Sequence, residues 1–167
     1  MIHNKTWRLK EEIVKRSISK DWDVARLEWV IQSTRVSKIA NTCLCTKYPI
    51  YEISDLLNIY NNVVVRVGNC CVKKFIDDAS SFIAGLKRIF GDLSASAGRI
   101  VIDRALKEGV ISNKNYLFYS DTLRKRKLSL YQLEYRRDLN RRILRRFWVE
   151  DKTNKIDLGS EDGEVEL

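Results

Sequence analysis

Apolar residues recur at helical spacing in several parts of the chain and at strand-like density in its first third. Residues 7–14 carry apolar side chains on one face and predict a short amphipathic helix near the N-terminus. Residues 21–28 can add one or two helical turns. The segment 29–36 is rich in β-branched and aromatic residues, which is typical of a strand.

Two further strand-like segments, residues 50–53 and 63–67, predict a β-hairpin in the middle of the chain. Asn61 and Asn62 suit the turn between them, because asparagine tolerates a positive φ angle. Gly68 then permits an abrupt change of direction into the next element.

The clearest helical pattern begins just after this hairpin and ends at Gly91, a natural C-terminal stop. Its apolar residues repeat at intervals of three and four: Val72, Phe75, Ile76, Ala79, Phe82, Ile83, Leu86, Ile89 and Phe90. This stripe predicts one long helix that buries all nine side chains in the core, with Asp77 and Asp78 exposed in its first turn.

Three more helices follow in the last third of the chain. Apolar residues within 100–106 mark the first, and Ser112 is a suitable cap for the second. Ser129 and Gln132 match a capping box at the start of a long helix that we expect to end near Trp148. Its predicted buried stripe is Tyr131, Tyr135, Leu139, Ile143 and Phe147.

The chain of 167 residues has a single proline and no Gly/Ser-rich or Pro-rich linker. We therefore predict one domain over residues 1–149, with a knuckle-hairpin-helix module at about 29–91 and a helical part at about 92–149. The predicted fold class is α+β, mostly helical with an embedded zinc-knuckle or treble-clef-like hairpin module. We expect residues 150–167 to form an acidic and flexible tail. The longest uncharged apolar-rich run, residues 56–65, is about half of what a membrane span needs, and no signal peptide is recognisable, so we expect a cytoplasmic protein with no membrane partner.

The net charge of +9 is unevenly distributed. Residues 124–146 contain ten basic and two acidic residues, a balance of +8, whereas residues 150–167 contain seven acidic residues and two lysines, a balance of −5. Arginine pairs well with phosphate, so this basic segment indicates a nucleic-acid partner. The expected phosphate-binding residues are Arg124, Lys125, Arg126, Lys127, Arg136, Arg137, Arg141, Arg142, Arg145 and Arg146. A solvated helix face, or a surface for an acidic protein, is the alternative.

Four cysteines form two close pairs, Cys43 with Cys45 and Cys70 with Cys71. A tight turn can direct the first two thiolates toward one ion, and the second pair lies at a helix start, where thiolates are favoured. We therefore predict a structural zinc site with Cys43, Cys45, Cys70 and Cys71 as candidate ligands.

Adjacent cysteines rarely bind one tetrahedral ion together, so a fourth ligand can come from His3, Asp55, Asp77 or water. The alternatives are reduced cysteines that pack as small apolar residues, a disulfide and redox chemistry.

Three short motifs resemble a group of uncharacterised bacterial and phage zinc-knuckle proteins: residues 42–50 (TCLCTKYPI), 67–75 (VGNCCVKKF) and 122–133 (TLRKRKLSLYQL). The similarity covers roughly residues 25–145. It implies Cys43, Cys45 and Cys71 as zinc ligands and a phage or mobile-element origin. This chain has Thr46-Lys47 where the group has Gly-His.

No glycine-rich phosphate loop follows a strand, and the chain has one histidine. We therefore expect a binding protein and not an enzyme. The leading hypothesis is a phage or mobile-element accessory protein that binds nucleic acid through its basic helix. The alternative hypothesis is an inhibitor or adaptor that binds and masks a host protein, for example a defence or transcription factor.

Overall fold

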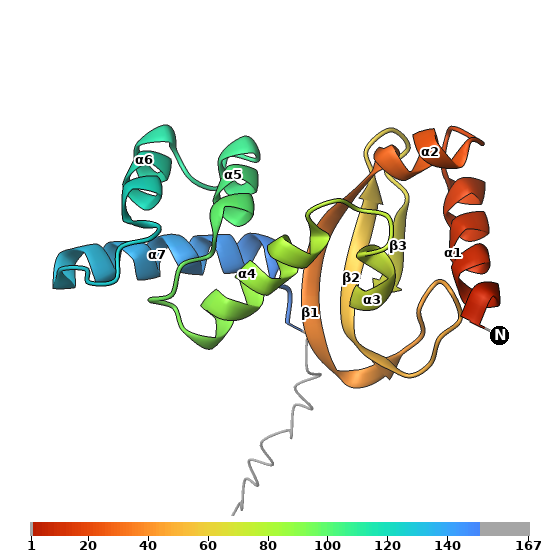
Figure 1. The fold of residues 1–167 in the computed structure, drawn as a ribbon, viewed down its shortest axis with the longest axis horizontal. Coiled ribbons are helices and arrows are strands. Elements are labelled where there is room, and N and C mark those ends of the chain that lie inside the picture. Colours follow the sequence, from red (N-terminus) through yellow and green to blue (C-terminus); the bar gives the residue numbers. More distant parts are fainter. Residues whose placement is uncertain (1, 151–167) are drawn as a thin grey trace, which may run out of the picture.

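The computed structural model describes residues 2–150, with side chains from residue 5 onward. The chain folds into a small antiparallel sheet and a set of helices that make up about half of its length, so the α+β prediction is confirmed. In Figure 1 the sheet and the N-terminal helix form one half, α5, α6 and α7 form the other, and α4 connects them. The predicted tail lies outside the described residues, apart from Glu150.

In the first part of the chain each predicted helix and strand is present, and several are longer than predicted. The elements are α1 (Ile2–Arg16), α2 (Trp22–Ala25), a 3-10 turn (Arg26–Glu28), β1 (Trp29–Asn41), β2 (Ile50–Asn58) and β3 (Val64–Gly68). The later elements are α3 (Asn69–Val72), α4 (Ala79–Gly91), α5 (Arg99–Lys107), α6 (Asn113–Thr122) and α7 (Leu130–Phe147).

The sheet is an antiparallel meander in the order β1-β2-β3. Trp29 pairs with Asn58 at one end of β1, and Leu57 pairs with Val64 beside the hairpin turn. Asn62 has a φ of 59°, as the predicted turn requires. The first two strands extend beyond their predicted ends, to Asn41 and Asn58. In β2 each residue from Ser54 to Asn58 has a ladder partner on β1, whereas β1 is irregular after Val36 and pairs again at Asn41, with Ile50.

The prediction of one helix over residues 70–90 is wrong, because the chain breaks between α3 and α4. Phe75 is buried in this break and meets the Trp22 ring edge-on, with centroids 5.9 Å apart. Asp78 has a φ of 62°, a left-handed conformation that aspartate tolerates, and α4 starts at the next residue. Asp77 and Asp78 therefore belong to a connection and not to a helical first turn.

Local capping signals in the second half are confirmed. The Ser112 side chain accepts from the amide of Asn115, and Ser129 forms the complete capping box with Gln132 at the start of α7. Two aromatic side chains assigned to the core are nevertheless exposed, since Tyr131 and Phe90 are 76% and 49% accessible.

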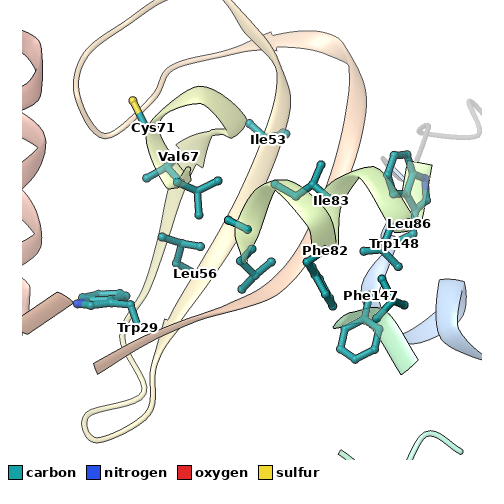
Figure 2. Packing of buried hydrophobic residues seen from close by; sticks show 14 of the residues in the cluster. Trp29, Ile53, Leu56, Val67, Cys71, Phe82, Ile83, Leu86, Phe147 and Trp148 are labelled. Atoms are coloured by element: carbon teal, nitrogen blue, oxygen red, sulfur yellow. The ribbon is translucent and has the colours of Figure 1, made fainter. Parts of the chain in front are cut away.

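One continuous apolar core joins the sheet to the helices. Figure 2 shows part of this core, with Cys71 beside the sheet and Phe147 with Trp148 on the opposite side of the view. Phe82 of α4 meets Phe147 of α7 edge-on at 5.3 Å. The residue after α7, Trp148, forms a parallel bridge with Thr34, so the last helix ends against the free edge of β1.

Candidate metal centre and basic surface

The loop between β1 and β2, residues 42–49, is a tight knuckle held by its own backbone. The Cys43 amide donates to the Lys47 carbonyl at 2.9 Å, and the Thr46 amide donates to the Cys43 carbonyl at 2.7 Å. Thr46 has a φ of 72°, which closes the turn. The Leu44 amide donates to the Arg66 carbonyl at 3.0 Å, so β3 fixes the position of the knuckle.

Three cysteine sulfurs gather where this knuckle meets α3. The sulfurs of Cys43, Cys45 and Cys71 all lie within 4.8 Å of one another, and those of Cys45 and Cys71 are 3.5 Å apart. All three residues are buried, at 3%, 2% and 7% accessibility. Cys70 is exposed and lies outside the cluster, because successive residues of a helix project in different directions. The structure therefore does not support Cys70 as a fourth ligand.

Hydrogen bonding within the cluster shifts the pKa values of Cys43 and Cys71 in opposite directions. The hydrogen bond with Cys71 and the bond from the Gly68 amide, at 3.2 Å, lower the pKa of Cys43 to about 5 although burial opposes this. The same hydrogen bond and burial raise the pKa of Cys71. The hydrogen bonds thus favour the thiolate of Cys43, which is the form that binds metal.

The geometry of the three sulfurs suits a soft metal ion. A zinc–sulfur distance of about 2.3 Å and tetrahedral angles place thiolate ligands roughly 3.8 Å apart. The Cys45–Cys71 separation of 3.5 Å needs only a small adjustment to reach this value. Three thiolates form a donor set that favours zinc and other thiophilic ions over magnesium or calcium.

None of the acidic candidates for the fourth ligand lies near the cluster. Asp55 forms ion pairs with Arg35 at 2.6 Å and Arg66 at 3.1 Å. The Asp77 side chain is 88% exposed and lies 3.9 Å from Arg26. Within the described part of the chain the cluster comprises three residues, and the side chain of His3 lies outside that part.

A hollow of about 260 Å³ adjoins the cluster and contains Cys43, Cys71 and Asn69 in its walls. Asn69 is 3% exposed and accepts a hydrogen bond from Ser54 at 2.8 Å, while its Nδ2 has no partner. Water or a small ligand can therefore approach the metal site from this side.

The ten basic residues predicted to contact phosphate divide into three groups. Arg136 is 4% exposed, its guanidinium donates to the Thr122 carbonyl, and it lies over the Tyr119 ring at 5.5 Å. Arg136 is buried and hydrogen-bonded inside the protein, so the prediction that it contacts phosphate is wrong.

Three of the remaining arginines are partly neutralised by carboxylates. Arg137 pairs with Glu134, Arg142 pairs with Asp138, and Arg146 pairs with Glu108. Of the ten predicted residues, six have exposed side chains and no ion pair among residues 5–150: Arg124, Lys125, Arg126, Lys127, Arg141 and Arg145.

The fold adds two arginines that the charge pattern did not reveal. Arg88 of α4 and Arg99 of α5 line a hollow of about 390 Å³. Arg99 also lines a second hollow of about 510 Å³, where it meets Arg124 and Lys125. Isolated arginines carry no sequence signal, and only the packing of α4, α5 and α6 brings these charges together. We call Arg88, Arg99, Arg124 and Lys125 the basic groove.

Comparison with protein-family models, curated proteins and solved structures finds no match for this chain. The resemblance to zinc-knuckle proteins therefore rests on its short motifs. Among residues 2–150, no helix is both long enough and apolar enough to cross a membrane.

Proposed function

We propose that this protein binds nucleic acid through phosphate contacts in the basic groove, and that a structural zinc ion at Cys43, Cys45 and Cys71 stabilises its sheet. The observation that carries the proposal is the position of Arg99. This residue lies in the walls of two hollows and so connects Arg88 on one side with Arg124 on the other.

The composition of the groove favours a polyanion. Its four basic side chains are accompanied by one acidic residue, Asp121, in the lining of the two hollows. The Arg99 guanidinium is oriented by neutral oxygens, since it donates to Tyr116 at 3.1 Å and to Ser120 at 2.9 Å. An arginine that is oriented without being neutralised retains its charge for phosphate.

The zinc ion has a structural role in this proposal. Cys43 and Cys45 belong to the knuckle and Cys71 to α3, which has only four residues. Such a short helix gains little stability from its own hydrogen bonds, so a shared ion would fix it to the sheet. A bound ion would stabilise the fold by cross-linking α3 to the knuckle through the three thiolates. The hydrogen bond from the Gly68 amide orients the Cys43 sulfur.

Charge reversal tests the nucleic-acid proposal. We expect Arg99→Glu and Arg124→Glu each to lower the affinity for a random-sequence duplex by at least about tenfold at low salt, since each replaces a phosphate contact by a repulsion. Arg8→Glu is the matched control, because Arg8 is exposed on α1 in the opposite half of the molecule and changes the net charge equally. Equal effects of all three substitutions would show that the groove has no special role.

A second candidate function, an inhibitor or adaptor that binds a host protein, is favoured by an apolar cluster beside α2. Ile18, Leu27 and Ile59 are 63%, 64% and 49% exposed. Their backbones all lie near Glu28, because Leu27 precedes it, the Ile18 amide donates to its side chain and the Ile59 amide donates to its carbonyl. Exposed apolar clusters of this kind are common at protein interfaces.

The salt dependence of binding distinguishes the two candidate functions. Phosphate binding weakens steeply as salt rises, whereas binding through the apolar cluster changes little and is lost in Leu27→Asp. The phage or mobile-element origin is the remaining part of the proposal, and the motif resemblance supports it.

A further inference from the structure

A hollow of about 290 Å³ lies where the end of α4 meets the end of α7. Its walls combine two aromatic rings, Phe90 and Trp148, with Leu144 and the basic residues Arg141 and Arg145. The two rings stack, with centroids 4.7 Å apart and planes inclined by 24°. An aromatic surface bordered by arginines is a common arrangement in sites that hold the bases of single strands.

Phe90 is half exposed although its ring stacks on Trp148. Trp148, on which it rests, is 8% exposed, but Phe90 itself is 49% exposed. The buried partner fixes the orientation of the ring, and the exposed side remains open for stacking. A ring fixed in this way loses little conformational entropy when a second planar group packs on it.

The two arginines of the hollow have retained their charge. Arg141 and Arg145 lie one turn apart on α7, are exposed, and form no ion pair among residues 5–150. Their sequence neighbours Arg142 and Arg146 are both paired with carboxylates. The unpaired side of α7 is therefore the side that borders Phe90.

We infer that this hollow binds an unpaired nucleotide, whose base stacks on Phe90 while Arg141 and Arg145 hold the adjoining phosphates. This inference rests on the proposed function and adds a preference for single strands. A base inside a duplex is already stacked on both faces and cannot reach the ring. Glu150, also in the wall, can accept a hydrogen bond from a ring N–H of an unpaired base, such as N3–H of thymine.

The test compares a labelled (dT)15 oligonucleotide with a 15-base-pair duplex at the same low salt. We expect Phe90→Leu, which keeps an apolar contact with Trp148 but removes the aromatic face, to weaken (dT)15 binding roughly 5- to 100-fold. Duplex binding through the basic groove should stay within about twofold of wild type. Tyr60→Leu is the matched control, because Tyr60 is a 70% exposed aromatic residue in the hairpin turn.

Arg145→Glu provides a second variant that does not alter the aromatic packing, and it should weaken (dT)15 binding as well. Unchanged (dT)15 binding in Phe90→Leu and Arg145→Glu would overturn the inference, and so would an equal loss on duplex and single strand. A wild-type protein that binds the duplex but not (dT)15 would overturn it while leaving the proposed function intact. Failure to bind either probe would remove both.

Discussion

At the scale of single residues, the buried carboxylate of Glu28 holds three segments together. It accepts hydrogen bonds from the amides of Ile18 at 2.8 Å and Ser19 at 2.7 Å, and from Asn58 Nδ2 at 2.7 Å. Burial acts to raise the pKa of Glu28, but these hydrogen bonds outweigh it and the pKa is lowered. The charged form is therefore favoured in the folded state, and the resulting stability is present above the unfolded-state pKa.

Glu28→Gln should lower the free energy of unfolding at pH 7 by about 2 kcal/mol. The charged acceptor is lost, and the NH2 group of the glutamine faces the N–H groups that donate to Glu28. The wild-type protein should lose this contribution as the pH falls below about 4.5 and through the lower folded-state pKa, and the variant should show a flatter pH dependence there. Urea unfolding at several pH values measures both effects. Equal stabilities at pH 7 would show that the hydrogen bonds contribute nothing.

Arg136 and Arg124 have opposite roles although both belong to the basic segment. Arg136→Met should lower the free energy of unfolding by about 2 kcal/mol, because the Thr122 carbonyl loses a charged donor, while nucleic-acid affinity stays unchanged. Arg124→Gln should leave stability within about 0.5 kcal/mol of wild type and weaken nucleic-acid binding. Denaturation and binding measured on the same samples test both, and a reversed pattern would refute this assignment.

Helix caps could be predicted from the sequence, whereas the burial and clustering of individual arginines could not. Ser112 and Ser129 were predictable as caps because a cap depends on neighbouring residues. The burial of Arg136 was not, because charge suggests exposure and only the packing of α6 against α7 supplies the Thr122 carbonyl. Arg99 was likewise invisible until folding placed it beside Arg124.

At the scale of elements, the contact between α4 and α5 depends on Gly85. A Cβ atom at this position would overlap the Ala97 carbonyl oxygen and lie 2.6 Å from Val101 Cγ2. Gly85→Ala should therefore lower the free energy of unfolding by about 2–3 kcal/mol through overpacking. Gly91→Ala in the same helix, where a Cβ meets nothing within 4 Å, should be neutral or slightly stabilising. Urea unfolding measures the stability of both variants. Equal free energies of unfolding would show that Gly85 does not lie as close to Ala97 and Val101 as the structure places it.

The connection between the knuckle and α3 depends on the proposed metal ion. Cys43→Ser, Cys45→Ser and Cys71→Ser should each reduce bound zinc and lower the free energy of unfolding by about 2 kcal/mol or more. Cys70→Ser, which alters an exposed thiol outside the cluster, should change neither. Native mass spectrometry gives the metal content, and melting with and without chelator gives the stability.

A full complement of zinc in Cys43→Ser would exclude this ligand set. Loss of zinc in Cys70→Ser would show that the exposed thiol is a ligand after all. If the wild-type protein purified with added zinc contains none and is insensitive to chelator, the three cysteines pack as small apolar residues.

The main error in the predicted fold is the single helix expected from Val72 to Phe90. A stripe of apolar residues continues without interruption from Val72 to Phe90, and local pattern alone favours one helix. At the break Phe75 packs against Trp22, which lies about fifty residues earlier in the chain, and Asp78 adopts a left-handed conformation. The sulfur cluster was predictable in part, since the spacing identified Cys43 and Cys45, but choosing Cys71 over Cys70 on geometric grounds needs the orientation of α3.

At the scale of the whole molecule, the two halves have different proposed roles. The sheet half contains the candidate metal centre, and the basic groove lies on the helical half and on α4, which connects the two halves (Figure 1). The end of α7 is anchored on β1, where the Val149 amide donates to the Thr34 carbonyl at 3.3 Å. The stability of the sheet half therefore supports the position of the helix that carries most of the basic segment.

The affinity of the protein for a random-sequence duplex, measured across a salt series, tests whether the basic groove binds phosphate. With about four to six phosphate contacts, the logarithm of the association constant should fall linearly with the logarithm of salt concentration, with a slope of roughly −4 to −5. Arg99→Glu should make the slope shallower by about one. An affinity that does not depend on salt, or no binding even at low salt, would contradict the account and assign the basic groove to another partner.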